Sequence, residues 1–422
     1  MLNQNIGILN GVAIAISMVI GSGLFALPSL VIESTDPITA FIGWIIIILL
    51  MPSLIHIFSF LGQKYPTSSG IVSYSKEGFG NWSEKGFALI ICGSLLVGMP
   101  AFFMIAGSFI VELLYLDKNL WLAPISIIVA LLSTFMNIQG VERFSFVNKV
   151  VVILILVLVL ILIFFSIPTY NINLFVEKSI NTDLNFKNIW LASAIVFWAF
   201  QGWENLTFGV GEFHKPEKTI KIVFWSSFFI VSLIYFFFSL SATFISLSGL
   251  EITGLSGLSL ILGEGIYRNI LLFFIIMVLI ANANSWVFGA SRAFYSSSKA
   301  GVLPKQLSKT NNKNLPIVSL LTLLVFYILI ILVIDIYDIN IKYAFLLTTQ
   351  GFIILYGASL FTFYKLTEGF GNRFILLLAL LLWAFLMQGF GLLIIYPVSL
   401  FLIGTLISKY EKRKKNGKMD IS

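Results

Sequence analysis

The chain has 422 residues, of which 59% are hydrophobic and 11% charged, and its formal net charge is +7. A soluble domain of this size does not need so much apolar surface, so the composition predicts an all-α polytopic membrane protein that lies in a lipid bilayer. The one cysteine, Cys92, excludes an internal disulfide and a cysteine-based metal cluster, and the sequence predicts no cofactor.

About twelve apolar runs are long enough to cross a hydrocarbon core of roughly 30 Å. No polar run between them is long enough for a separate soluble domain, so we predict a single membrane domain over residues 1–422. The predicted transmembrane helices lie at about 6–32, 38–61, 86–115, 120–138, 147–167, 188–211, 220–247, 269–298, 316–334, 342–364, 373–388 and 390–408.

The 26 lysine and arginine residues lie mostly in alternate connectors and in a basic tail at residues 409–422. Cytoplasmic connectors of membrane proteins carry an excess of these residues. The bias predicts a multi-pass protein of the cell (inner or plasma) membrane with both termini in the cytoplasm. It also explains the positive net charge without a nucleic-acid partner.

The first predicted helix is interrupted within residues 19–28 by Gly21 and Gly23, which flank Ser22. Each glycine costs a helix about 1 kcal/mol relative to alanine. An opened helix frees backbone groups that need a polar cavity or a polar ligand at that depth. The alternative is that these small residues only let another helix approach closely.

After the second helix, the connector at residues 65–80 carries apolar or aromatic residues at Ile71, Tyr74 and Phe79. This spacing favours a short helix at the inner membrane interface.

A second interruption is expected in the sixth helix, where Gln201, Glu204 and Asn205 cluster around Gly202. Glu204 is the one acid that we place well within a predicted span, and an ionised side chain there is costly unless it is paired, hydrated or protonated. We therefore expect Glu204 to serve as a gate, a proton site or both. The alternative is a protonated structural carboxyl group hydrogen-bonded to a neighbouring helix.

The two interruptions lie in the first helix of each of two five-helix sets that run in opposite directions. Such a pattern indicates a transporter built from an inverted repeat. We place the first repeat at about 6–167, the second at about 188–364, and two further helices at about 373–408.

The helix ends at the interruptions suit a zwitterionic α-amino acid. The N-terminal end of the outer half-helix, near Leu24, and the Ser22 hydroxyl would hold a carboxylate. Carbonyl groups near Val19, Ile20 and Trp198 would hold an ammonium group. Glu204 is the one candidate partner for a cationic side chain, so we expect a neutral substrate in an apolar pocket. Its expected lining is Phe25, Ile105, Trp198 and Phe200.

Five segments carry distinctive motifs: residues 21–28 (GSGLFALP), 65–70, 197–204 (FWAFQGWE), 212–217 (EFHKPE) and 291–304. Together, and in this order, they resemble the motifs of the amino acid–polyamine–organocation (APC) superfamily of transporters. Within that superfamily the chain most resembles the bacterial exporters of L-methionine and branched-chain amino acids.

The resemblance implies a LeuT-type fold of five plus five inverted helices with two added, in which helices 1 and 6 are discontinuous. It implies alternating-access transport of amino acids, linked to protons or to exchange (antiport). In relatives the carboxylate is held at the positions of Ser22 and Gly23, and the amine by carbonyls at the positions of Val19, Trp198 and Gln201. The predicted substrate-binding residues are thus Val19, Ile20, Gly21, Ser22, Gly23, Leu24, Trp198, Phe200, Gln201 and Gly202.

The resemblance also assigns Glu204 to gating or proton coupling and makes Trp286 a second aromatic residue on the gating path. A tryptophan in a helix bundle is more often a packing residue, which is the alternative for Trp286. Arg292 is expected to face cytoplasmic water or a phosphate group. Asn282 and Asn284 either line the cavity or form interhelical hydrogen bonds.

We therefore expect a secondary transporter that exports neutral hydrophobic amino acids (methionine, leucine, isoleucine, valine), as a monomer or homodimer. The alternatives are a proton-coupled importer, an amino acid/polyamine antiporter, or a non-transporting amino acid sensor. An enzyme is not expected, because His56 and His214 lie far apart in the sequence and no nucleophile–base pair or metal site is evident.

Overall fold

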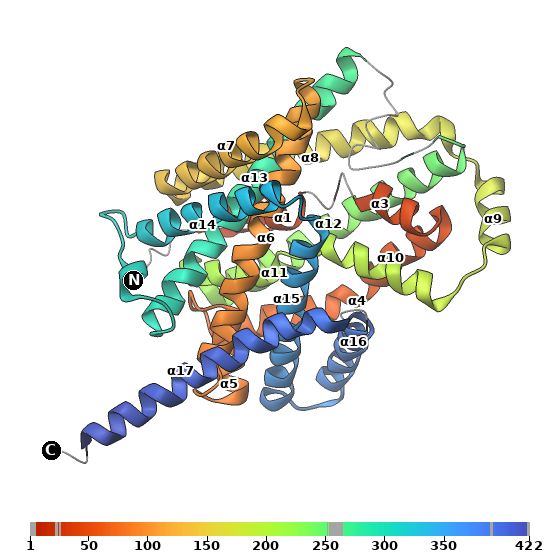
Figure 1. Cartoon of the computed structure of the whole chain (residues 1–422). Helices are drawn as coiled ribbons and strands as arrows, with labels where there is room; N and C mark the ends of the chain where they lie inside the picture. The colour runs from red at the N-terminus through yellow and green to blue at the C-terminus, as the bar shows by residue number, and fades with distance from the viewer. Residues whose placement is uncertain are drawn as a thin grey trace.

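The computed structural model describes residues 6–21, 24, 27–250, 252, 265–388 and 391–419. These residues form helices joined by short connections, and they contain no strand beyond one isolated bridge between Ile6 and Phe213 (Figure 1). The helices are α1 (Ile8–Val19), α3 (Leu27–Ser34), α4 (Pro37–Lys64), α5 (Ile71–Phe79), α6 (Glu84–Leu113), α7 (Lys118–Gln139), α8 (Val141–Ser166), η1 (Ile167–Thr169), α9 (Ile172–Asn181), α10 (Phe186–Ala199), α11 (Trp203–Leu206), η2 (Thr207–Glu212), α12 (Pro216–Leu247), α13 (Ile266–Lys299), η4 (Lys305–Ser308), α14 (Ile317–Ile336), α15 (Lys342–Leu366), α16 (Phe370–Met387), η5 (Gly391–Ile394) and α17 (Ile395–Met419).

Ten helices in the described part of the chain are long and apolar enough to cross a membrane. They confirm the predicted all-α polytopic membrane protein. The predicted discontinuities are also confirmed, because α1 ends at Val19 before α3 begins at Leu27, and α10 ends at Ala199 before α11 begins at Trp203. The count of twelve crossings adds these two interrupted segments to the ten helices. That count, the repeat boundaries and the single domain stay predictions.

In Figure 1, α1 and α11 lie near the middle of the molecule, and α3 and α10 lie towards its right-hand side. The short helix α1 contacts α8, α12, α13 and α11. Around it, α4 packs along α12 and α10, and α6 packs along α7, α13, α15 and α17. The helices α6, α12, α13 and α15 are therefore placed to contribute side chains to the broken region.

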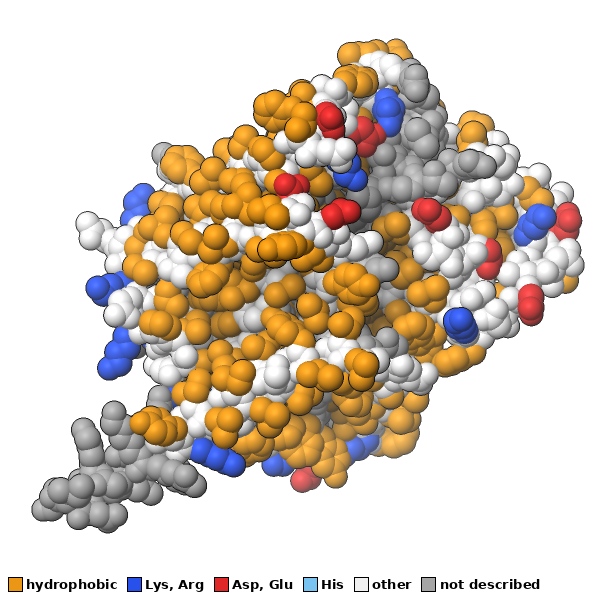
Figure 2. Space-filling view, in the orientation of Figure 1, with side chains coloured by type: hydrophobic (Ala, Val, Ile, Leu, Met, Phe, Trp, Pro, Cys, Tyr) orange, Lys and Arg blue, Asp and Glu red, His pale blue; other side chains and the backbone are white. Residues whose placement is uncertain are grey.

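Large apolar side chains are exposed on the outer helices, for example Phe135 of α7, Leu160 of α8 and Val325 of α14. Figure 2 shows orange side chains across most of one face of the molecule. Apolar exposure on this scale suits a protein surrounded by hydrocarbon rather than by water.

Local sequence sets several helix ends. The Asp36 side chain accepts hydrogen bonds from the backbone N–H groups of Ile38 and Thr39, as an N-cap residue does at the start of a helix. Gly140, between α7 and α8, has a φ of +110°, which residues with a side chain rarely adopt. The short helix predicted within residues 65–80 is confirmed as α5. Its place at the membrane interface stays a prediction.

Candidate functional site

The two interruptions touch each other at Gly202. This residue has a φ of +130°, and a Cβ added to it would lie 2.9 Å from the carbonyl oxygen of Met18. A larger residue would therefore be strained by its own backbone and blocked by the backbone of α1. The glycine that predicted the second break is thus the residue that lets the two broken segments meet.

Tyr235 of α12 joins the same two segments from the side. Its buried hydroxyl lies 3.0 Å from the carbonyl oxygen of Val19 and 2.9 Å from that of Ala199. These carbonyls belong to the last residues of α1 and α10, whose helical acceptors would otherwise lack partners. Tyr235 could not be predicted from the sequence, because a tyrosine within an apolar run carries no local signal for this role.

Asn282 and Trp286 of α13 bind the end of α1. The Asn282 amide donates to the carbonyl oxygens of Ser17 and Met18 at 2.7 and 2.9 Å, and the Trp286 indole N–H donates to Met18 at 2.8 Å. A Cβ added at Gly21 would lie only 2.1 Å from the Asn282 side chain. Gly21 therefore makes room for Asn282, and Trp286 has a polar contact as well as a packing role.

A small cavity lies where these residues converge, with a volume of about 10 Å³. This is room for roughly one water molecule. The ring of Phe102 lies 5.6 Å from that of Trp198 and 5.2 Å from that of Trp286, and Phe345 packs 4.3 Å from Trp198. An amino acid would fit only if these aromatic side chains moved. The cavity is lined by Met18, Val19, Phe102, Trp198, Gln201, Asn282 and Trp286.

Two neutral acceptors in this lining have no hydrogen-bond partner among the described residues: Gln201 Oε1 and Asn282 Oδ1. The residues are 3% and 1% exposed. The Gln201 amide nitrogen donates to the Thr349 hydroxyl at 2.9 Å. Because Asn282 uses its nitrogen for two backbone carbonyls, its oxygen is the atom left for a ligand. A buried acceptor without a partner is destabilising, so both atoms favour a ligand with hydrogen-bond donors.

Glu204 lies next to the cavity but is not one of the residues lining it. Its buried carboxylate accepts hydrogen bonds from the Gly202 N–H at 3.0 Å and from the hydroxyl of Tyr356 on α15. It forms no ion pair within the described part of the chain. Glu204 thus connects the second break to α15 through hydrogen bonds.

The other predicted site residues divide into four groups. Val19, Trp198 and Gln201 lie at the cavity. Phe200 instead points towards Trp44 and Tyr235, with ring centres 6.4 and 5.0 Å away. Ser22, Gly23 and Phe25 lie outside the described residues. Ile20, Leu24 and Ile105 are buried and are not among the cavity-lining residues.

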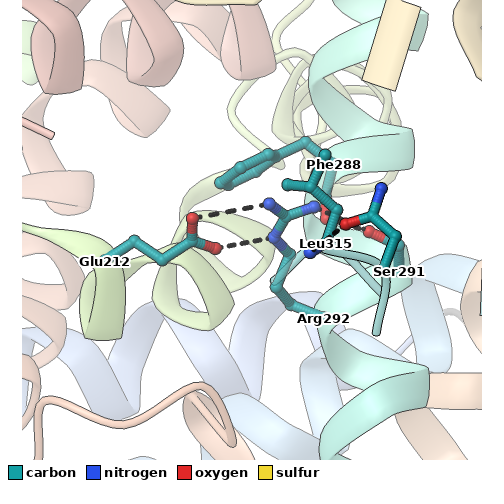
Figure 3. A network of polar contacts seen from close by, with 6 residues as sticks. Glu212, Phe288, Ser291, Arg292 and Leu315 are labelled. Carbon is teal, nitrogen blue, oxygen red and sulfur yellow. Dashed lines mark hydrogen bonds and ion pairs between the residues drawn. The ribbon is translucent and has the colours of Figure 1, made fainter. Parts of the chain in front are cut away.

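The prediction for Arg292 is wrong. Its side chain is 1% exposed and pairs with the buried carboxylate of Glu212, with Nε and Oε1 2.7 Å apart (Figure 3). The guanidinium group also stacks on Phe288, 3.8 Å from the ring centre. The sequence placed Arg292 near a helix end and hence near water. Its partner is 80 residues away in the chain, where α13 passes η2.

The N-terminal segment is fastened at the same place. The Ile6 N–H donates to the Glu212 carbonyl at 3.0 Å, and the His214 N–H donates to the Ile6 carbonyl at 2.9 Å. The Arg292–Glu212 ion pair therefore lies where three parts of the chain meet: the start of α1, the end of the second broken segment and α13.

The sequence matches the amino acid permease family over residues 6–419. This chain belongs to the amino acid permease family. The match confirms the predicted relation to the APC superfamily. The protein is accordingly a multi-pass membrane protein of amino acid transport and not an enzyme.

Similar proteins include transporters of several kinds. The permease YecA of Bacillus subtilis is 23% identical over 322 residues, covering 75% of this chain and 74% of the relative. The L-methionine/branched-chain amino acid exporter YjeH of Escherichia coli is 23% identical over 56% of this chain and 55% of the relative. The serine/threonine exchanger SteT of B. subtilis is 28% identical over 56% of this chain and 54% of the relative.

The fold is similar to that of a Na⁺-coupled sialic acid symporter in a substrate-bound, outward-open state. The TM-score is 0.62 over 85% of this chain and 78% of the symporter, at 11% sequence identity. This likeness confirms the predicted LeuT-type fold.

Proposed function

We propose that this permease is a secondary transporter that exports neutral hydrophobic amino acids by alternating access, coupled to protons or by exchange. The observation that carries the proposal is the meeting of two broken helices at one cavity lined by aromatic, aliphatic and neutral amide side chains. Broken helices at the bilayer midplane are the usual setting of a transporter's substrate site.

The ammonium group of the substrate binds to Asn282 Oδ1 and Gln201 Oε1, beside the carbonyls of Val19 and Trp198. Support comes from the two unpartnered acceptors in the cavity lining. The Tyr235 hydroxyl, which has one proton, lies within hydrogen-bond distance of the carbonyls of both Val19 and Ala199, and the amide oxygens add two further acceptors. We assign the carboxylate to Ser22 and Gly23 at the predicted start of the outer half-helix, as the helix dipole favours.

The substrate's side chain lies among Phe102, Trp198 and Trp286. These residues favour an apolar side chain such as that of methionine, leucine, isoleucine or valine. A cationic side chain would require a carboxylate, and Glu204 already accepts two hydrogen bonds from the protein. Glu204 instead couples proton binding or gating to the second break.

Export from the cytoplasm is proposed from the resemblance to the exporter. The distribution of lysine and arginine along the chain supports an orientation with both termini in the cytoplasm. The membrane that we propose is the inner or plasma membrane of the cell. In Figure 2 blue side chains lie along the lower and left edges with little red beside them, whereas towards the upper right blue and red side chains occur together, with a broad orange band between. An excess of basic over acidic side chains at the lower left is expected when that side faces the cytoplasm.

The test is solute counterflow with purified protein in liposomes. Liposomes loaded with unlabelled leucine should accumulate labelled methionine, and loading with lysine should give no accumulation. Binding of methionine without counterflow by any amino acid would replace the proposal with the sensor. Direction is tested in cells that lack their own exporters: expression should lower the intracellular methionine and leucine content. A higher content would indicate import.

A further inference from the structure

An open apolar groove lies away from the substrate cavity, between α5, α6, α15 and α16. Its volume is about 530 Å³, which is within the range of small-molecule sites. Aromatic rings form much of its wall. Gly357 and Trp383 both line it, and the Trp383 indole N–H donates to the Ile353 carbonyl at 2.8 Å. The residues that define its extent are Phe87, Gly357, Phe361, Tyr364, Leu380 and Trp383.

The groove has the length of one lipid leaflet. Along α15 its lining runs from Ile354 to Tyr364. Ten residues at the helical rise of 1.5 Å span about 15 Å. This is half of a hydrocarbon core of roughly 30 Å. An acyl chain that entered the groove at Tyr364 would end near the bilayer midplane.

Two cations stand at the end of the groove that the charge bias assigns to the cytoplasm. The Lys365 ammonium lies 4.8 Å from the ring centre of Phe361 and donates to the Gly78 carbonyl at 2.7 Å. The Arg373 guanidinium lies 4.2 Å from the ring centre of Tyr364 and donates to the Tyr364 carbonyl at 3.1 Å. Both rings belong to the groove wall, so each cation is fixed directly beside the opening.

These cations keep their charge available. Neither Lys365 nor Arg373 pairs with a carboxylate among the described residues. Glu368 is exposed in the turn between α15 and α16, so residues 365–373 retain a net positive charge. An apolar groove of one-leaflet length with cations at the headgroup level is complementary to an anionic lipid.

We propose that this groove binds an anionic glycerophospholipid. One acyl chain lies along α15 and α16 between Phe87 and Trp383, and the phosphate group contacts Lys365 and Arg373. The proposal is independent of the amino acid substrate. A neutral lipid would fill the groove without gaining the two charge contacts.

The experiment is native mass spectrometry of the full-length protein in detergent, titrated with dioleoylphosphatidylglycerol or dioleoylphosphatidylcholine. The wild type should retain the phosphatidylglycerol preferentially. The double variant Lys365→Gln/Arg373→Gln should bind it about tenfold more weakly, because each basic side chain near an anionic headgroup contributes measurably. Binding of phosphatidylcholine should not change.

Lys305→Gln/Lys309→Gln is the matched control, since it removes two exposed cations outside the groove. It should retain the wild-type lipid preference. The double variant could misfold, because Lys365 also contacts α5. In that case Arg373→Gln alone and the groove-filling variant Leu380→Trp test the proposal instead. Leu380→Trp should weaken the binding of both lipids. Three results would overturn the proposal. The control pair could lose phosphatidylglycerol binding as strongly as the double variant, or the wild type could show no lipid preference. Leu380→Trp could also change only the oligomeric state and leave lipid binding unaltered.

Discussion

Gly202 and Met18 bring the two helix breaks into contact, since a Cβ at residue 202 would lie 2.9 Å from the Met18 carbonyl oxygen. The same glycine donates its N–H to Glu204. The backbone conformation at the second break, its close approach to α1 and a hydrogen bond to the buried Glu204 therefore all depend on Gly202. Any movement of the second broken segment must change its contact with α1.

Gly202→Ala should impair both folding and transport. Its φ of +130° and the close carbonyl should lower the free energy of unfolding by about 1–3 kcal/mol. Thermal unfolding and counterflow measure the two effects. The control is Gly371→Ala, where an added Cβ meets nothing within 4 Å. That variant should be neutral or slightly stabilised, and an equal loss in both variants would show that the break contact is unimportant.

Tyr235→Phe should weaken the link between α1 and α10. It removes the hydroxyl near the carbonyls of Val19 and Ala199, and an unpaired buried polar group costs about 1–3 kcal/mol. Tyr327→Phe is a matched control, because the buried Tyr327 hydroxyl has no hydrogen-bond partner among the described residues. We expect lower thermal stability and slower counterflow in Tyr235→Phe only. Wild-type behaviour of Tyr235→Phe would contradict the bridging role.

Glu204→Gln should flatten the pH dependence of transport more than it weakens substrate binding. The change removes the ionisable group while keeping a side chain of similar shape between Gly202 and Tyr356. Counterflow across the acidic to neutral range, together with equilibrium binding of methionine, measures the two effects. Glu112→Gln is the control, because Glu112 pairs with Arg268 away from the breaks. If Glu204→Gln retains the wild-type pH profile, the acid has no coupling role.

Arg292→Gln should destabilise the protein strongly, since it leaves Glu212 buried and unpaired. Breaking a buried ion pair costs about 3–5 kcal/mol. The double variant Glu212→Gln/Arg292→Gln should recover part of this loss. Lys76→Gln breaks the more exposed pair with Glu84 and should cost less than about 1 kcal/mol. Thermal unfolding compares the three variants, and equal losses in Arg292→Gln and Lys76→Gln would refute the importance of burial.

Much of the fold was predictable because it depends on local composition. Long apolar runs identify membrane helices, and the glycines at residues 21 and 202 identify the two places where helices open. The amphipathic spacing in residues 65–80 likewise predicted α5. In each case the determining residues lie within the element itself.

The site was less predictable because its contacts join distant segments. Tyr235 lies in a run of apolar residues that gives no sign of the two carbonyls beside it. Asn282 could be named as polar, but only the fold shows it against Gly21. Arg292 was misplaced for the same reason, since Glu212 lies on another element.

We propose that the two breaks form one site for a neutral amino acid. The most direct measurement is counterflow of labelled methionine in liposomes containing wild-type protein or Asn282→Leu, with Gly371→Ala as control. We predict leucine-driven accumulation for the wild type and the control, and none for folded Asn282→Leu. Accumulation at the wild-type rate by Asn282→Leu, or its absence with folded wild-type protein, would contradict the claim.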